Sequence, residues 1–450
     1  MSHRRDGWMD GLADGDVEAL ELRAATLARV EGEGGMRVLV RDGQVSDVRL
    51  DIYEPPRFFE ALLRGRAATE APDITSRICG ICPVAYQMSA CLAVEDACGV
   101  EIPEHIRLLR RLLYCGEWLE SHALHVYLLH APDFLGYPGA IEMARDHRDA
   151  VNRGLRLKQA GNAVLATIGG RAVHPVNVRV GGFHRLPRTG ELRELRAVVA
   201  TALDDALATV EMAAGFDYPD FEQPYEYVSL RHERDYPIEA GSFVTSSGEA
   251  FPVAGFPDRV TEEHVEHSNA LHARMGGGTY VVGPLARYSL NADRLTPLAR
   301  QAADRAQLGP TCRNPFRSIV VRAVELVVAA EEALRILDGW APEGPAAVPV
   351  PPRAGTGHGA TEAPRGALYH RYELAPDGTI VQAAIVPPTS QNLASIEADL
   401  RGFVQPRIGL DAEELTRQCE QAIRNYDPCI SCATHFLTLT VETDDTVGPG

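Results

Sequence analysis

The chain has 450 residues, and its 44 lysines and arginines against 62 aspartates and glutamates give a formal net charge of −18 at pH 7. A surface this acidic repels phosphate backbones and anionic membranes, so it disfavours a nucleic-acid-binding or membrane-surface protein. Hydrophobic residues make up 45% and charged residues 24% of the chain, which excludes intrinsic disorder for most of its length.

The cysteines and the N-terminal sequence predict the compartment. There are nine cysteines, an odd number, and the chain begins MSHRRDGWMDGLADGD without an apolar export segment. Both features favour a reducing compartment and free thiols over a disulfide framework. No apolar run approaches the roughly 20 residues of a membrane span. We expect a cytoplasmic protein, although a chain exported together with a partner would also lack its own signal.

Strands are predicted near both ends of the chain and long helices between and after them. Apolar and polar residues alternate through residues 36–52 around Asp42-Gly43, and again through residues 368–386 around Asp377-Gly378, as in β-hairpins. Helical periodicity marks residues 104–131, 145–168, 191–214, 315–338 and 411–425. Several of these segments are apolar on more than one face, which is typical of central helices. We predict an α+β fold that is predominantly α, with a central bundle of long helices and small peripheral β-hairpins.

The chain shows no clean division into domains. The stretch rich in proline and glycine at residues 341–360 is followed at once by structured sequence, so we interpret it as a surface loop of one domain spanning residues 1–435. His122 and His125 are expected to be hydrogen-bonded near the centre of the molecule rather than metal ligands. His264, His267 and His272 are expected on the solvated face of a helix.

Two segments carry most of the chemistry: RICGIC at residues 77–82 and DPCISCATH at residues 427–435. A two-residue gap lets both thiolates of a pair face one metal centre from a tight turn, where backbone N–H groups favour the anionic form. Two such pairs could build a structural Cys₄ zinc site, although zinc ribbons usually draw both pairs from a compact segment. A thioredoxin-like redox site is disfavoured because neither pair sits in a βαβ pattern.

The two segments resemble the first and last cysteine motifs of the large subunit of nickel–iron hydrogenases, R-x-C-G-x-C and D-P-C-x-x-C-x-x-H. Three further segments resemble motifs of that family in the expected order: RVEG at residues 29–32, EAPRG at residues 362–366 and VPPT at residues 386–389. The matches extend from residue 29 to residue 435. The resemblance implies the fold of that subunit and the reversible heterolytic cleavage of dihydrogen into protons and electrons.

Carried over to this sequence, the resemblance makes Cys79 and Cys429 the terminal thiolates of nickel, and Cys82 and Cys432 the thiolates that bridge nickel to iron. Soft thiolates suit both metals. The family's centre also carries carbon monoxide and cyanide on iron, as Ni-Fe(CN)₂(CO). The remaining cysteines, which lack cluster spacing, are expected to be small buried apolar residues: Cys91, Cys98, Cys115, Cys312 and Cys419.

The resemblance also implies roles around the metals. Cys432 is expected to take the proton from dihydrogen and pass it to Glu31, since partial burial can raise the pKa of a carboxylate toward the working pH. Arg365 is expected to lie over the open metal face. A buried guanidinium needs an anionic partner, and Asp427 is the expected one.

Two secondary contacts follow from the same motifs. Thr389 is expected to hydrogen-bond a cyanide ligand, next to Pro388, where relatives often carry serine. The family binds a magnesium or iron ion near the end of the mature chain, and here its predicted ligands are Glu60 and His435. The tail at residues 436–450 resembles the family's C-terminal maturation peptide, which is removed after nickel is inserted.

The resemblance implies partner proteins. No C-x₂-C-x₂-C pattern remains to hold iron–sulfur clusters, so a separate small subunit must carry them. No nucleotide fingerprint is present, so FAD and NAD(P) are expected on flavin and iron–sulfur diaphorase subunits. A maturation endopeptidase and nickel-insertion chaperones are expected as transient partners.

Two departures from the family's motifs, Tyr86 and Ser121, point to its cytoplasmic, NAD(P)-linked bidirectional or sulfhydrogenase-type group. The alternatives are a large subunit of a deazaflavin-reducing cytoplasmic hydrogenase and a non-catalytic scaffold with a Cys₄ zinc site.

Overall fold

The computed structural model describes residues 19–435. Its α-helices are α1 (Phe59–Leu63), α2 (Ala71–Thr75), α3 (Pro83–Cys98), α4 (Glu104–Leu124), α5 (Ala131–Leu135), α6 (Ala140–Asp146), α7 (Arg148–Gly169), α8 (Thr189–Ala214), α9 (Pro284–Asn291), α10 (Pro297–Arg305), α11 (Ser318–Gly339), α12 (Pro388–Val404), α13 (Ala412–Arg424) and α14 (Ile430–Ala433). Its strands are β1 (Ala19–Ala24), β2 (Gly34–Arg41), β3 (Gln44–Ile52), β4 (Val178–Arg179), β5 (Gly182–Phe183), β6 (Val228–Arg231), β7 (Ser242–Thr245), β8 (Ala250–Phe251), β9 (Val260–Glu263), β10 (His272–Met275), β11 (Gly355–Ala363), β12 (Gly366–Leu374) and β13 (Ile380–Val386).

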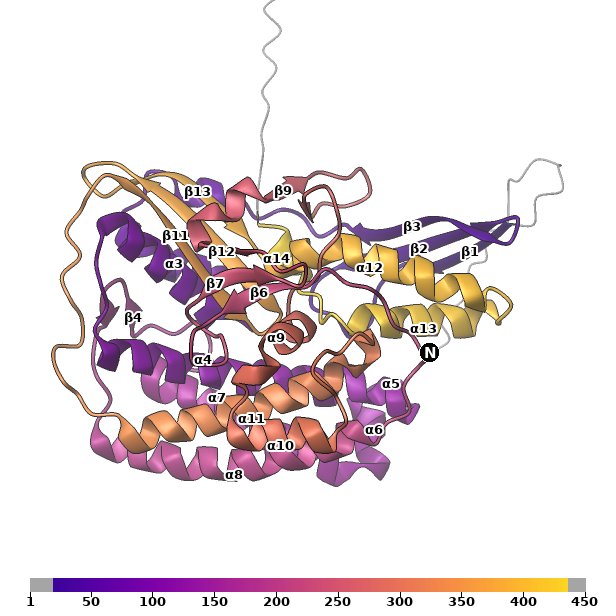
Figure 1. Cartoon of the computed structure of the whole chain (residues 1–450), viewed down its shortest axis with the longest axis horizontal. Helices are drawn as coiled ribbons and strands as arrows, with labels where there is room; N and C mark the ends of the chain where they lie inside the picture. The colour runs from indigo at the N-terminus through magenta and orange to yellow at the C-terminus, as the bar shows by residue number, and fades with distance from the viewer. Residues whose placement is uncertain (1–18, 436–450) are drawn as a thin grey trace, which may run out of the picture.

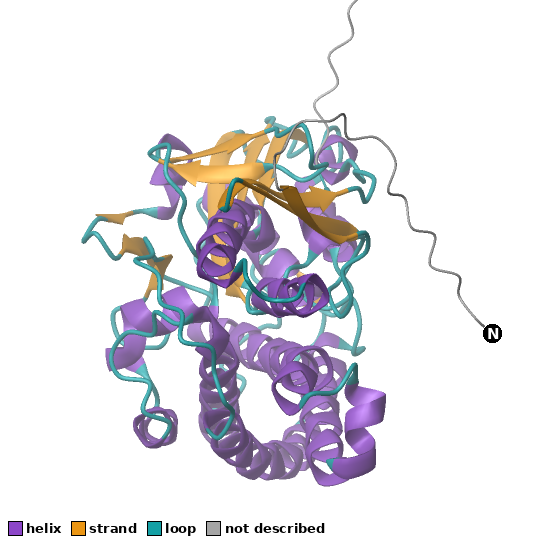
Figure 2. Ribbon diagram, turned by 90° about the vertical axis from the view of Figure 1, so that its right-hand side faces the viewer, coloured by secondary structure: helices purple, strands orange, loops and turns teal. Residues whose placement is uncertain are grey.

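Long helices form one half of the molecule, and the strands lie in the other half, where they pack against α3, α12 and α13. In Figure 1, α4, α7, α8 and α11 run side by side along the lower half, and Figure 2 shows the strands gathered above them. The apolar run IVVRAVELVVAA makes α11 buried on nearly every side, so it packs against both α4 and α8. The predicted predominantly helical α+β fold is confirmed.

Small residues bring two of these helices close together. A side chain at Gly116 of α4 would meet the Val164 side chain at 2.7 Å, and one at Gly161 of α7 would meet the Gly116 carbonyl oxygen at 2.5 Å. The backbones of α4 and α7 therefore cross without intervening side chains, and only glycine fits at this crossing.

Both predicted hairpins are present, and each gains a third strand. The antiparallel sheets have the orders β1-β2-β3, β6-β7-β8 and β11-β12-β13, and the pairs β4-β5 and β9-β10 form two-stranded ribbons. The turn between β2 and β3 places both Asp42 and Gly43 at positive φ, 52° and 71°, as expected for an Asp-Gly hairpin.

The segment at residues 341–360 is a surface loop only up to Ala354, because β11 begins at Gly355. Glycine alternates along this strand. Side chains at Gly357 and Gly359 would meet the backbone carbonyl oxygens of Ala93 and Ser89 at 2.0 and 2.3 Å. The bare face of β11 thus lies directly on α3, so these glycines permit packing rather than marking a linker.

The five predicted helices are confirmed with changed limits. The helix expected at residues 104–131 continues from α4 into a π-helical turn at His125–His130 and then into α5. The helix expected from residue 145 is interrupted at His147, between α6 and α7. Neither α3 nor α12 was predicted. All residues of α3 except Leu92 and Asp96 are buried, so its sequence has no polar face to reveal a helical period.

Candidate metal centre

The two cysteine segments, at opposite ends of the sequence, meet in the interior. Cys82 directly precedes α3 and Cys429 directly precedes α14, which carries Cys432. The Sγ atoms of Cys79 and Cys429 lie 3.5 Å apart, those of Cys82 and Cys432 3.8 Å apart, and those of Cys429 and Cys432 2.8 Å apart. None of the four residues is more than 3% exposed. The four predicted metal-binding thiols therefore form one buried cluster.

Local structure favours a thiolate at Cys79. The backbone N–H groups of Ile81 and Cys82 point at its sulfur, 3.3 and 3.5 Å away. Hydrogen bonds from the other three thiols, of which the one from Cys429 has the largest effect, hold the pKa of Cys79 well below its usual value. Burial raises the pKa of Cys429. Four sulfurs this close cannot all be anions without a cation among them, and soft thiolates are the donor set for nickel and iron.

Glu31 lies against this cluster, but on a different cysteine from the one predicted. Its backbone forms a parallel bridge with Cys429 and accepts a hydrogen bond from Ile430 N at 2.9 Å. Its carboxylate Oε2 lies 2.9 Å from Sγ of Cys429 and accepts the Ser431 N–H at 3.1 Å. The prediction that Cys432 is the thiol beside Glu31 is therefore wrong. The bridge aligns Glu31 with Cys429, whereas Cys432 lies one helical turn further on and faces Cys82.

Arg365 and Asp427 form the predicted ion pair. Nη2 of Arg365 lies 3.1 Å from Oδ1 of Asp427, and Nε donates to the Asp427 carbonyl oxygen at 2.8 Å. Burial raises the pKa of the Asp427 carboxyl, and both side chains are at most 3% exposed. Asp427, the first residue of the second cysteine segment, has a left-handed backbone conformation, with φ of 52°. The pair thus fixes the guanidinium to the start of the segment that carries Cys429.

Several polar atoms in this region are buried without a hydrogen-bond partner within residues 19–435. They include Nη1 of Arg365, Oδ2 of Asp427 and the Tyr86 hydroxyl. Orphaned buried donors and acceptors are rare and need a partner. The cysteines raise the pKa of the Tyr86 hydroxyl after burial, so that hydroxyl lies close to them. Four sulfurs, an unpartnered guanidinium N–H and an unpartnered hydroxyl fit a metal group that carries its own hydrogen-bonding ligands.

Thr389 and Pro388 lie at the start of α12, beside the cluster. The Thr389 hydroxyl oxygen accepts the Cys429 N–H at 3.0 Å, and both residues are buried. This contact holds the backbone of Cys429 and leaves the hydroxyl hydrogen to be donated elsewhere. Donation to a cyanide ligand stays a prediction.

Glu60 and His435 also meet. Nε2 of His435 lies 3.8 Å from Oε1 of Glu60 and 2.7 Å from the Ile385 carbonyl oxygen, while Nδ1 lies 2.6 Å from the Cys432 carbonyl oxygen. Glu262, which was not predicted, lies close to both residues: burial raises its pKa to about 7, and its charge interacts with those of His435 and Glu60. The two predicted cation ligands are therefore adjacent, and a second acidic side chain, that of Glu262, lies near them.

Comparison with known proteins identifies the chain. The sequence pattern described as nickel-dependent hydrogenase matches residues 57–154 and 262–435. The chain belongs to this family. It is the catalytic large subunit of a nickel–iron hydrogenase, which excludes the alternative of a non-catalytic zinc scaffold.

Relatives cover almost the whole subunit. Sulfhydrogenase 1 subunit alpha of Pyrococcus furiosus is 37% identical over 423 residues, which are 92% of this chain and 97% of that protein. The NAD-reducing hydrogenase HoxS subunit beta of Cupriavidus necator is 26% identical over 469 residues, 91% of this chain and 94% of that protein. A crystal structure of an NAD⁺-reducing nickel–iron hydrogenase in the H₂-reduced state matches with a TM-score of 0.84 and 28% identity, over 92% of this chain and 99% of that one.

Two residues that were not predicted, Arg57 and Glu117, hold the segments around the four cysteines in place. Arg57 donates through Nη2 to the Ile78 carbonyl oxygen at 2.6 Å and also to that of Ser431, so one side chain ties the two cysteine segments to each other. Glu117 of α4 accepts the N–H groups of Val84 and Ala85 at 2.6 and 3.1 Å, and thereby caps α3 directly after Cys82. Neither Arg57 nor Glu117 belongs to a motif that could have marked it in the sequence.

A buried ion network holds the segment that contains Glu31. Arg424 of α13 forms two hydrogen bonds to Asp133, at 2.7 and 2.9 Å, and donates to the Ala28 carbonyl oxygen at 3.0 Å. Arg29, whose φ is 58°, pairs with the same aspartate and donates to the Leu129 carbonyl oxygen at 2.8 Å. The arginine of the RVEG motif therefore anchors the chain next to Glu31 instead of facing the metals.

The predicted burial of His122 and His125 is confirmed, whereas the helix expected to carry His264, His267 and His272 is wrong. His122 and His125 are at most 1% exposed, with Nε2 atoms 2.9 Å from Glu325 and 2.8 Å from the Arg424 carbonyl oxygen. His264, His267 and His272 do not lie on a helix. They belong to the β9–β10 hairpin, where His272 is fully buried, because strand pairing turns it toward α12.

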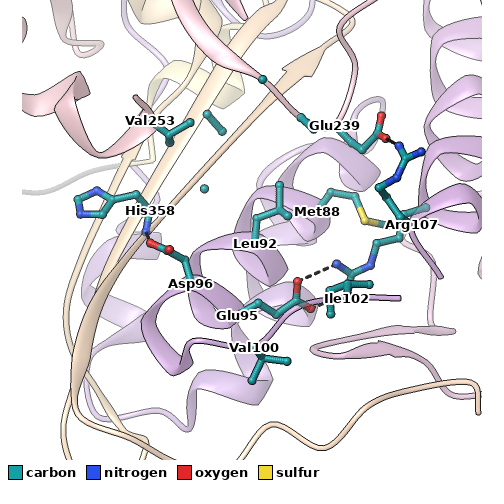
Figure 3. A pocket seen from close by; sticks show the side chains of 15 residues that line it. Met88, Leu92, Glu95, Asp96, Val100, Ile102, Arg107, Glu239, Val253 and His358 are labelled. Carbon is teal, nitrogen blue, oxygen red and sulfur yellow. Dashed lines mark hydrogen bonds and ion pairs between the residues drawn. The ribbon is translucent and has the colours of Figure 1, made fainter. Parts of the chain in front are cut away.

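A pocket of about 370 Å³ lies away from the cysteines, toward the far end of α3 (Figure 3). Its walls combine Met88 and Leu92 with charged groups that pair with each other: Arg110 with Glu95 at 2.6 Å, and Arg107 with Glu239 at 2.6 Å. None of the four clustered cysteines lines this pocket. Within residues 19–435, no helix is both long and apolar enough to cross a membrane.

Proposed function

We propose that this subunit cleaves dihydrogen reversibly and heterolytically at a Ni-Fe(CN)₂(CO) centre, releases the proton through Cys429 and Glu31, and passes electrons to a small iron–sulfur subunit and on to NAD(P). The observation that carries the proposal is the 2.9 Å contact between Cys429 Sγ and Glu31 Oε2, at the edge of a cluster of four buried thiols.

The four cysteines are the proposed ligands of the centre. Cys79 and Cys429 would bind nickel, and Cys82 and Cys432 would bridge nickel and iron. When bound, the centre supplies the Lewis acidity and the redox capacity needed to split dihydrogen. Burial of all four sulfurs keeps water away from it, because none of these residues is more than 3% exposed.

Glu31 is the proposed proton acceptor. Its Oε2 atom takes the proton from the Cys429 thiol, and the Ser431 N–H at 3.1 Å holds the carboxylate in that position. A second carboxylate lies beyond Ser431, because the Ser431 hydroxyl donates to Glu54 at 2.6 Å and Glu54 accepts the N–H of the exposed Glu33 at 3.1 Å. Ser431 therefore lies between two carboxylates, with Glu31 on its backbone N–H and Glu54 on its hydroxyl.

Arg365 is the proposed cover of the reacting face. Two hydrogen bonds to Asp427 orient the guanidinium, and Nη1 is left without a protein partner within residues 19–435. A fixed cation beside developing negative charge stabilises that charge without reorganisation at the moment of reaction. The Thr389 hydroxyl, next to Pro388, is the proposed donor to a cyanide ligand.

A magnesium or iron ion is proposed between Glu60 and His435, with the Ile385 carbonyl oxygen as a further ligand. An acidic side chain, a carbonyl oxygen and an imidazole suit such a cation. The bond after His435 is the proposed site of maturation cleavage in a single domain of residues 1–435. The predicted tail, residues 436–450, lies outside the described residues.

The proposed partners are a small iron–sulfur subunit, flavin and iron–sulfur diaphorase subunits, a maturation endopeptidase and nickel-insertion chaperones, in the cytoplasm. Support for NAD(P) as acceptor is the similarity to proteins named NAD-reducing. A second acceptor, sulfur, is worth testing because a relative of higher identity is named a sulfhydrogenase.

The test is metal analysis and infrared spectroscopy on the purified complex, followed by dihydrogen-dependent reduction of NAD, NADP, a deazaflavin and polysulfide. We expect equal amounts of nickel and iron, carbon monoxide and cyanide stretches, and the fastest reduction with NAD or NADP. Cys79→Ser should lose nickel, whereas the control Cys98→Ser, at the far end of α3, should keep it. Zinc without the infrared bands would refute the proposed centre, and preference for another acceptor would refute the NAD(P) assignment alone.

A further inference from the structure

A second group of metal-binding side chains lies outside the cysteine cluster, where the β9–β10 hairpin packs on α12. It consists of His267 in the loop between the strands, His272 at the start of β10, and Glu397 on α12. One ligand atom from each lies within 4.8 Å of the other two. Nε2 of His267 is 2.7 Å from Oε1 of Glu397, and Nδ1 of His272 is 3.9 Å from Oε2.

His272 lacks the partners that a buried imidazole needs. It is 0% exposed, and neither ring nitrogen has a hydrogen-bond partner within residues 19–435. The ring instead packs edge-on against His267, with centroids 5.8 Å apart. Unpaired buried nitrogens are destabilising, and they are uncommon in folded proteins. A cation held by one of these nitrogens would satisfy it.

The carboxylate of the group is already fixed in position. Oε1 of Glu397 accepts the backbone N–H of Leu50 in β3 at 2.9 Å, in addition to its contact with His267. Outer hydrogen bonds that orient a ligand are a regular feature of metal sites. The side chain of Glu397 is 17% exposed, as is that of His267, so solvent can reach the site and complete the coordination.

We propose that His267, His272 and Glu397 bind a zinc ion. Two imidazoles and one carboxylate are a known zinc ligand set, with a fourth position for water. Metal–ligand bonds of about 2.1 Å place tetrahedral ligands about 3.4 Å apart. The present separations of 2.7 and 3.9 Å lie on either side of that value, so small side-chain movements complete the site.

The ion would fasten three segments that the backbone alone does not join. It links the loop before β10, β10 itself and α12, and through Glu397 it reaches β3. The start of the same helix holds the Cys429 backbone through Thr389. Because the ion would join segments of the fold and lies outside the cysteine cluster, its proposed role is structural. Zinc binding at this site can therefore be tested whether or not the proposed hydrogenase chemistry holds.

Zinc content of the purified hydrogenase complex tests this proposal. The complex is incubated with Zn²⁺, passed over a chelating resin and analysed for zinc, nickel and iron. We expect about one zinc per large subunit in the wild type, and a loss of affinity of more than roughly 10-fold in His267→Gln and in His272→Gln, with nickel and iron unchanged. His264→Gln is the control, because this neighbouring exposed histidine lies outside the group. Equal zinc in wild type and both variants refutes the site, as does an equal loss in His264→Gln.

Two measurements separate this site from zinc bound by the cysteines and from misfolding. Co²⁺ bound to thiolates gives sulfur-to-metal charge-transfer absorption, which Co²⁺ on imidazole and carboxylate lacks, so the additional Co²⁺ of the wild type should add no such band. Anomalous scattering on the two sides of the zinc absorption edge should place a peak between His267 and Glu397 in wild-type crystals. A peak only at the cysteines, or none, overturns the proposal without recourse to any variant.

Discussion

Glu31→Gln is the substitution that most directly tests the proton path. Glutamine has the same length as glutamate and can still accept the Ser431 N–H, so packing and the parallel bridge to Cys429 should be retained. What disappears is a basic oxygen 2.9 Å from Sγ of Cys429. The change therefore removes the proton acceptor and leaves the thiol cluster intact.

The expected magnitude follows from this direct contact. A positioned general base contributes about 10²–10⁴-fold, which corresponds to roughly 3–5 kcal/mol of activation free energy. Glu31→Asp should fall between wild type and Glu31→Gln, since removing one methylene group withdraws the carboxylate by about 1.5 Å. The aspartate carboxylate could still accept the proton through a water molecule, whereas the glutamine amide is not a base.

The assay is exchange between dihydrogen and D₂O, which needs proton transfer but no electron acceptor. Nickel and iron contents are measured on the same samples. Glu33→Gln is the matched control, because the Glu33 side chain is exposed and its hydrogen bonds with Glu54 use backbone atoms, which the substitution retains. Exchange in Glu31→Gln within about 3-fold of wild type, at full nickel content, would refute the role of this carboxylate.

Three further predictions concern stability. Glu325→Leu removes one of two carboxylates that pair with the 0% exposed Arg287 guanidinium, the one that accepts from it through two 2.8 Å bonds, and leaves Glu362 at 3.1 Å. The loss should lower the free energy of unfolding by about 3 kcal/mol in thermal or denaturant unfolding. Burial raises the pKa of Asp399 from 3.8 to about 7, so between these pH values the folded state binds a proton that the unfolded state has lost. The free energy of unfolding should therefore fall as pH rises through this window, by up to about 1.4 kcal/mol per pH unit. Asp399→Asn should flatten that slope in melting curves, and an unchanged slope contradicts the assignment. Thr389→Val leaves the Cys429 N–H unpaired and should cost about 1–3 kcal/mol with a partial loss of nickel, whereas full nickel and unchanged stability would show that the contact is dispensable.

The sequence by itself determined the helical class, the two hairpins and which four of the nine cysteines gather in one buried cluster. Hairpins with an Asp-Gly turn and amphipathic or apolar helices depend on local spacing, which the sequence displays directly. The paired cysteines depend on a two-residue gap that needs no knowledge of the fold. Helix α3 was missed because a helix that is buried on nearly all sides shows no alternation of polar and apolar faces in its sequence.

Tertiary structure decided which groups face each other. It placed Glu31 on Cys429 instead of Cys432, because a backbone bridge between residues 398 positions apart sets that register. It turned the glycines at the start of β11 into a packing surface on α3. It also moved His272 from an expected solvated face to a buried position beside Glu397. Contacts between distant segments depend on packing of the whole core, and the periodicity of one segment carries no record of what another segment brings to it.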